Sequence, residues 1–132
     1  MDKSTILKSF NTLFFTFIDD ILTIYPENKE IKQGRDRFEL IKKGNPTVII
    51  KFWKRYVSDV YREQIESGNM SFFIEKDYRA DFAATDGWCE AYDKILKSID
   101  NIRATIRDMD DVNRQHSAEY LLNLSKLSNM YV

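Results

Sequence analysis

Residues 45–60 read NPTVIIKFWKRYVSDV and carry bulky apolar side chains at steps of three and four residues. These side chains are Ile49, Phe52, Trp53, Tyr56, Val57 and Val60. Such spacing places them on one face of an α-helix. Pro46 suits a first helical turn and Gly68 suits a stop, which predicts a helix of about 20 residues, roughly 30 Å long. Because these large side chains need partners on several sides, we expect this helix to be central in the fold.

The composition sets the class of protein. A chain of 132 residues fits one domain with a buried core, here taken as residues 1–132. The 43% hydrophobic and 31% charged residues are typical of a globular protein, and only four glycines and two prolines interrupt the periodic segments. The sequence therefore predicts an all-α, single-domain bundle of five or six helices.

Charge, cysteine usage and hydropathy restrict the compartment and the partners. A net charge of −1 gives no overall attraction to nucleic acid or to an anionic membrane. The single Cys89 excludes an internal disulfide and favours a reducing compartment. The apolar residues 13–18 are interrupted by Thr16 and followed by two aspartates, and they are far fewer than the roughly 20 that a bilayer requires. We expect a cytoplasmic protein with no export signal and no membrane span.

The first 43 residues predict two helices. Residues 4–25 carry one wide apolar stripe, and Phe15 and Ile24 lie outside it, which indicates burial on a second side or an exposed apolar spot. Pro26 should end this helix and begin a second, polar helix over residues 26–43. Gly44 follows two lysines and should adopt the left-handed conformation that ends a helix. The tight turn that follows predicts antiparallel packing of the second helix against the third.

The remaining segments are less regular. Residues 71–76, SFFIEK, predict a short element that closes one end of the bundle, and residues 77–87 predict a connection. A final helix is expected over residues 112–128, with apolar positions at Leu121, Leu122, Leu124 and Leu127. Residues 129–132 are expected to form a frayed tail.

A heptad-like pattern marks the segment between residues 88 and 109. Apolar side chains alternate there at steps of four and three, at Trp88, Tyr92, Ile95, Ile99, Ile102, Ile106 and Met109. This seam is typical of a long helix that packs against its neighbours in one bundle. The alternative is a coiled-coil-like contact with a second chain, so we treat these seven residues as a candidate self-association seam.

The charges are unevenly distributed along the chain. Residues 27–64 contain ten Lys/Arg against six Asp/Glu, whereas residues 65–111 contain six against eleven. These two segments either complement each other within the fold or leave a basic face that contacts phosphates or a protein partner. The candidate contact residues are Lys42, Lys43, Lys51, Lys54, Arg55 and Arg62. On the central helix we expect the apolar side to pack and this basic side to act at the surface.

Residues suited to catalysis or metal binding are few. His116 and Glu119 lie three residues apart, so they share a helical face and could supply two metal ligands, but a di-metal bundle needs several more. Cys89 could be activated near a helix start only if folding brought His116 to it. An enzyme would require a concave pocket near His116 or Cys89 with converging carboxylates. The sequence thus predicts a protein that is not an enzyme and holds no metal or other cofactor.

Several short motifs together resemble a group of viral proteins. These motifs are Phe14-Phe15, the turn Lys42-Lys43-Gly44-Asn45-Pro46, IIKFWKRYV at residues 49–57, Ser71-Phe72-Phe73-Ile74 and Asp77-Tyr78. In residues 10–80 the chain resembles small all-helical proteins of unassigned function from nucleocytoplasmic large DNA viruses of algae and amoebae. The resemblance implies a viral protein made in the host cytoplasm, with a place in the virion, and it brings no active-site residues.

These observations favour a non-enzymatic structural or protein-interaction protein, a minor virion component if the chain is viral. Its expected partner is a protein or a second copy of the chain. The alternative is a nucleic-acid-associated protein that uses the basic side of the second and third helices.

Overall fold

The computed structural model describes residues 2–59, 62–67 and 90–131. They form six α-helices, one π-helical segment and no strand, which confirms the predicted all-α bundle. The elements are α1 (Lys3–Ile24), α2 (Lys29–Gly44), α3 (Val48–Trp53), the π-helical segment η1 (Lys54–Ser58), α4 (Arg62–Glu66), α7 (Glu90–Arg107) and α8 (Asp111–Met130). The expectations for residues 71–76 and 77–87 lie outside the described residues.

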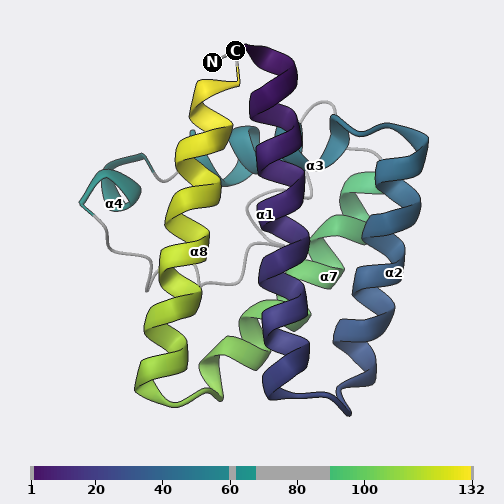
Figure 1. Cartoon of the computed structure of the whole chain (residues 1–132), viewed down its shortest axis with the longest axis vertical. Helices are drawn as coiled ribbons and strands as arrows, with labels where there is room; N and C mark the ends of the chain where they lie inside the picture. Colours follow the sequence, from purple (N-terminus) through teal and green to yellow (C-terminus); the bar gives the residue numbers. More distant parts are fainter. Residues whose placement is uncertain (1, 60–61, 68–89, 132) are drawn as a thin grey trace.

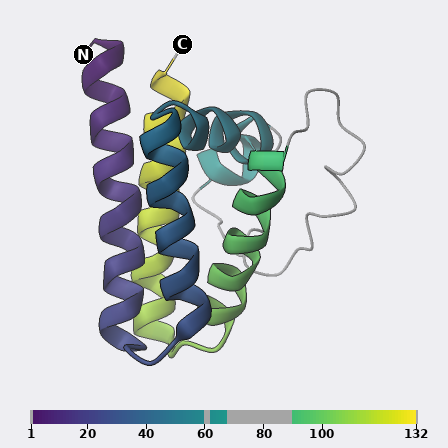
Figure 2. The ribbon, with the colours of Figure 1, turned by 90° about the vertical axis from the view of Figure 1, so that its right-hand side faces the viewer.

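Four long helices form the body of the molecule. Helices α1 and α8 pack along each other, and α2 packs along α7 (Figures 1 and 2). Neighbouring helices run in opposite directions, so the α1–α2 and α7–α8 connections lie at one end and both chain termini lie at the other (Figure 1). This up-and-down arrangement is the one that short connections between helices favour.

The segment predicted to be the central helix instead closes one end of the bundle. Figure 2 shows α3 leaving the end of α2 and running crosswise over the start of α7, while the ends of α1 and α8 extend past it. Its apolar face is buried as predicted at Ile49, Phe52, Trp53, Tyr56 and Val57, whereas Val60 lies outside the described residues. The expectation that it would pack antiparallel to α2 is therefore wrong, because the turn at Asn45 redirects the chain across the bundle.

This segment is also not one continuous α-helix. After Trp53 the chain widens into η1, where the Asp59 amide donates to the Lys54 carbonyl five residues earlier at 2.9 Å. A π turn of this kind adds one residue to a helical turn. Here it allows three consecutive side chains, those of Tyr56, Val57 and Ser58, to be buried against the bundle.

Aromatic rings fill the core beneath α3. Trp53 lies edge-on to Phe10 and Phe14 of α1, each with ring centroids 6.3 Å away, and Phe14 also meets Phe38 of α2 at 4.7 Å. Edge-to-face contacts at these distances are favourable beyond the apolar area that they bury. Four of the aromatic side chains of the sequence thus pack together where α1, α2 and α3 meet.

The ends of α2 differ from the sequence prediction. Asn28, not Pro26, begins this helix, because its Oδ1 accepts the Ile31 amide at 3.1 Å as an N-cap. Gly44 is the last helical residue and not a left-handed terminator. Asn45 caps the helix instead and accepts from the Thr47 amide and hydroxyl at 3.0 and 2.8 Å, which shapes the turn into α3.

The C-terminal tail is packed rather than frayed in its described part. Helix α8 continues to Met130, and Tyr131 is buried. The Lys54 ammonium donates to the Tyr131 carbonyl at 3.2 Å, and the Lys3 ammonium lies 4.7 Å above the Tyr131 ring. These contacts tie the end of the chain to α1 and η1.

Candidate functional site

The six predicted basic contact residues do not form one uniform exposed face. Lys43 and Lys51 are exposed at the end of the molecule where α3 crosses. Lys42 is half-buried, with its ammonium 4.8 Å above the Phe15 ring, and this contact also explains why Phe15 lies outside the main apolar stripe. Some of these cations are therefore exposed at the surface, whereas Lys42 makes a contact within the chain.

The remaining three basic residues are engaged within the chain. The Lys54 ammonium is held by the Tyr131 carbonyl, the Arg55 guanidinium lies 5.3 Å above the Tyr56 ring, and Arg62 pairs with Asp59 at 3.5 Å. Lys54 is thus part of the packing between η1 and the end of α8. This corrects the expectation that the basic side of this segment acts only at the surface.

The candidate self-association seam is buried within the chain's own core. Ile95, Ile99, Ile102, Ile106 and Met109 are each no more than 4% exposed. Tyr92 is half-buried, with its ring against Phe52 and Tyr56 at 5.4 and 5.6 Å, and Trp88 lies outside the described residues. These residues therefore pack within one bundle, as the first of the two interpretations predicted. A second copy cannot bind to a surface that neighbouring helices already cover.

Charge is separated along the long axis of the bundle. The half that carries the chain termini, hereafter the basic end, comprises residues 2–13, 37–59, 62–67, 90–98 and 121–131 and holds twelve Lys/Arg against seven Asp/Glu. The opposite half, the acidic end, comprises residues 14–36 and 99–120 and holds six against ten. The near-zero net charge of the chain thus conceals a positive end and a negative end.

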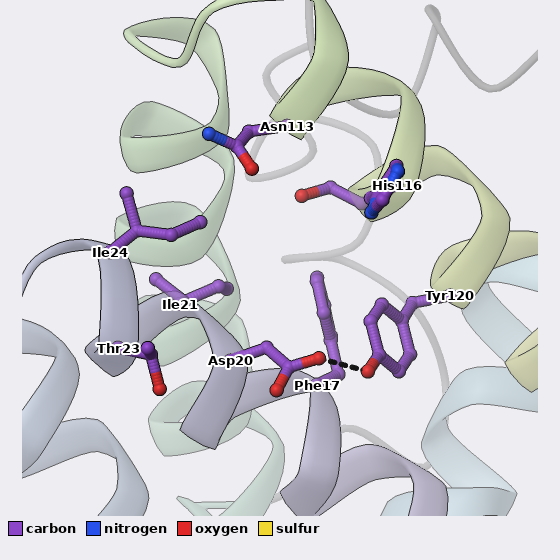
Figure 3. Close-up of a pocket in the computed structure, with 9 residues that line it drawn as sticks. Phe17, Asp20, Ile21, Thr23, Ile24, Asn113, His116 and Tyr120 are labelled. Carbon is purple, nitrogen blue, oxygen red and sulfur yellow. Dashed lines mark hydrogen bonds between the residues drawn. The ribbon is translucent and has the colours of Figure 1, made fainter.

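A pocket lies at the acidic end, between the last turns of α1 and the first turns of α8. Its volume is about 260 Å³, and its described lining residues are Phe17, Asp20, Ile21, Thr23, Ile24, Asn113, His116, Ser117 and Tyr120 (Figure 3). The α1 residues supply an apolar floor and the α8 residues supply a polar rim. The antiparallel packing of these two helices brings together groups about 100 residues apart in the sequence.

The central polar contact of this pocket joins Tyr120 to Asp20. The Tyr120 hydroxyl donates to Asp20 Oδ2, and its ring stacks on Phe17 with centroids 5.1 Å apart (Figure 3). The hydrogen bond to Asp20, together with desolvation and the carboxylate charge, raises the pKa of Tyr120 to about 12. The phenol therefore keeps its proton at neutral pH and acts as a donor to the carboxylate.

His116 lines the pocket, but Glu119 does not. Both residues are exposed on α8, and the carboxylate that lines the pocket with His116 is Asp20 of α1 and not Glu119. A pocket beside His116 is what an enzyme would require, yet Asp20 is the one carboxylate among its described lining residues. Cys89 lies outside the described residues.

Two further properties concern only the described part of the chain. Within residues 2–59, 62–67 and 90–131, no three His, Cys, Asp or Glu side chains gather as they would around a metal ion. None of the helices in those ranges is both long enough and apolar enough to cross a bilayer. Comparison of the chain with protein-family models, with curated proteins and with solved structures found no match.

Proposed function

We propose that this chain is a non-enzymatic structural protein that associates head to tail, with the basic end of one copy on the acidic end of the next. The observation that carries the proposal is the separation of charge along the bundle axis. When two copies point the same way, the basic end of one faces the acidic end of the next. When they point in opposite ways, ends of like charge face each other. Contacts of this kind join different surfaces of identical subunits and produce rings or filaments.

The exposed charges at the two ends support this arrangement. Lys43 and Lys51 lie at the basic end, and Glu27 and Asp108 lie in the connections that form the tip of the acidic end. Such charges steer association over roughly 10 Å at 0.1 M salt and are screened at higher ionic strength. The burial of the α7 seam further favours association through the ends over association through that helix. A subunit of this kind would suit the minor particle component that the viral resemblance implies.

Light scattering at high protein concentration tests the proposal. We expect species larger than a monomer at 50 mM NaCl that dissociate at 500 mM NaCl. The variants Lys43→Glu/Lys51→Glu and Glu27→Lys/Asp108→Lys should each stay monomeric at low salt. An equimolar mixture of the two variants should associate again, because the unchanged acidic end of the first is complementary to the unchanged basic end of the second. The fourfold variant should associate again.

A matched control separates end charge from net charge. The variant Lys32→Glu/Lys97→Glu changes net charge as much as Lys43→Glu/Lys51→Glu does, but these flank sites lie away from the two tips. Lys32 belongs to the acidic half of α2, and Lys97, although counted with the basic end, lies near the middle of α7. It should retain salt-sensitive association. A wild-type chain that is monomeric at every salt concentration would overturn the proposal, and so would equal effects of the flank and end variants.

A second candidate function follows from the same basic end. The exposed Lys43 and Lys51 would also suit a nucleic-acid backbone, whose binding weakens steeply with salt. Titration of a labelled DNA duplex at low salt distinguishes the two functions. Binding that is lost in Lys43→Glu/Lys51→Glu but kept in Glu27→Lys/Asp108→Lys would favour nucleic acid. No binding at low salt would remove this candidate.

A further inference from the structure

The pocket at the acidic end combines apolar side chains at its base with a hydrogen-bonded pair, Asp20 and Tyr120, whose oxygens can accept hydrogen bonds. Phe17 and Ile21 are buried beneath it, whereas Ile24, at the rim, is 40% exposed. The stacked rings of Phe17 and Tyr120 form one wall. Such a surface suits an apolar or aromatic group of a ligand, because the isoleucines and the rings would be removed from water on binding.

Several polar groups of the lining are already bonded within the chain. The Thr23 hydroxyl donates to the Asp19 carbonyl at 3.0 Å, the Asn113 amide donates to Asp110 at 3.3 Å, and the Ser117 hydroxyl points to the Met109 sulfur at 3.4 Å. These contacts use donor protons of the three side chains, and Asp20, Tyr120 and His116 are the remaining polar side chains of the described lining.

Asp20 determines the sign of the charge that this pocket prefers. It is the one acidic side chain among the described lining residues. Its Oδ2 accepts the Tyr120 hydroxyl, and a carboxylate offers about four acceptor sites in total, so its other oxygen can still accept. The Tyr120 oxygen, having donated its proton, can accept as well. An anion would meet this carboxylate at close range and be repelled, whereas an ammonium group would find two acceptors.

We infer that this pocket binds a small organic cation, a primary ammonium group attached to a compact aromatic or aliphatic body. The ammonium lies at Asp20 and the Tyr120 oxygen, and the body lies over Ile21 and Ile24. Drug-sized ligands occupy roughly 300–1,000 Å³, so the pocket of about 260 Å³ admits a smaller molecule. The negative potential of the acidic end adds to the attraction of a cation.

His116 provides a direct probe of binding. It is the only histidine in the chain, so its imidazole C–H signals in a proton NMR spectrum need no assignment by mutation. Titration with benzylammonium at pH 8 should shift these signals in a saturable manner. Benzyl alcohol, which has the same ring without the charge, should bind at least about tenfold more weakly.

Two carboxylate variants identify the group responsible. Asp20→Asn keeps an acceptor for the Tyr120 hydroxyl but removes the charge, and it should weaken benzylammonium binding about tenfold while leaving benzyl alcohol unaffected. Asp19→Asn is the matched control, because that neighbour pairs with Arg35 at 2.6 Å and does not line the pocket. It should bind as the wild type does.

The test is independent of head-to-tail association. It is repeated in the Lys43→Glu/Lys51→Glu variant, whose pocket is unchanged, so loss of association and loss of ligand binding are observed separately. Equal affinity for benzylammonium and benzyl alcohol would overturn the inference, as would equal effects of Asp19→Asn and Asp20→Asn. The absence of any saturable shift of His116 up to 50 mM benzylammonium, about fiftyfold above a dissociation constant of about 1 mM, would overturn it too.

Discussion

The two ends of the bundle are closed in different ways. At the basic end a whole segment, α3 with η1, crosses the long helices and buries Trp53, Phe52 and Ile50 almost completely. At the acidic end, among the described residues, two short connections join the helices, and a pocket remains between α1 and α8 (Figures 1 and 3). The first end therefore contributes mainly to stability, whereas the second leaves polar groups accessible to a ligand.

The polar contacts around Trp53 and those of the pocket show the same difference. At the basic end the Trp53 indole donates to Ser125 Oγ at 2.9 Å, and the Ser58 and Ser128 hydroxyl oxygens lie 2.6 Å apart, all of them buried. At the acidic end the Tyr120 to Asp20 contact is near the surface. A buried donor that loses its acceptor costs about 1–3 kcal/mol, whereas an exposed one is rescued by water. Substitutions at the two ends should differ accordingly.

The largest effect is expected at Trp53. Trp53→Ala removes the ring that packs on Phe10 and Phe14 and should reduce the free energy of unfolding by about 3–5 kcal/mol. Because a domain of this size is stable by only about 5–15 kcal/mol, the variant will be close to unfolding. Urea denaturation followed by circular dichroism measures the change.

Trp53→Phe separates packing from hydrogen bonding at the same position. It keeps most of the apolar volume but loses the bond to Ser125, so a smaller cost of about 1–2 kcal/mol is expected. If alanine and phenylalanine cost the same, the ring does not pack as described, and the basic end is not the more stable end.

Helix content and core residues were predictable from the sequence, because periodicity alone decides them. The apolar positions of residues 49–57 and of the seam at 95–109 are buried as their spacing predicts. The direction of α3 was not predictable, since a three- to four-residue period is the same for a helix along the bundle and for one across it. The π turn was likewise hidden, because Ser58 is buried only through partners on α8, about 70 residues away.

The pocket could not be predicted from local sequence. Asp20 belongs to a pair of aspartates typical of a solvated helix end, and Tyr120 lies outside any motif that the sequence presents. Their contact depends on the antiparallel packing of the first and last helices, which places the end of one beside the start of the other. Only a prediction of that pairing could have brought His116, Asp20 and Tyr120 together.

A smaller effect is expected at the N-cap of α2, within the acidic end. Asn28→Ala removes the acceptor for the Ile31 amide and the contact of Asn28 Nδ2 with Thr105 at 3.5 Å. The expected loss is about 1 kcal/mol, well below that of Trp53→Ala, because the freed amide can bind water. Thermal unfolding of the two variants side by side gives the comparison.

Asn28→Asp is the matched control for the cap. It keeps the acceptor and places a negative charge at the positive end of the helix dipole, so its stability should equal or slightly exceed that of the wild type. A loss in Asn28→Asp as large as in Asn28→Ala would mean that the contact with Thr105, and not the cap, holds the α1–α2 connection.

The smallest effect concerns the pH dependence of stability at Tyr120. Its pKa is raised to about 12 in the folded chain, chiefly by the hydrogen bond to Asp20, whereas an unfolded tyrosine titrates near 10. Between these values the unfolded state has lost a proton that the folded state retains, so this contribution is complete below pH 10 and disappears as the pH rises toward 12. Tyr120→Phe should therefore lower stability at pH 7, where this contribution is complete, and flatten the loss of stability between pH 10 and 12. Urea denaturation at pH 7, 9 and 11 measures this slope, and identical slopes for Tyr120→Phe and the wild type would show that Asp20 does not hold the phenolic proton.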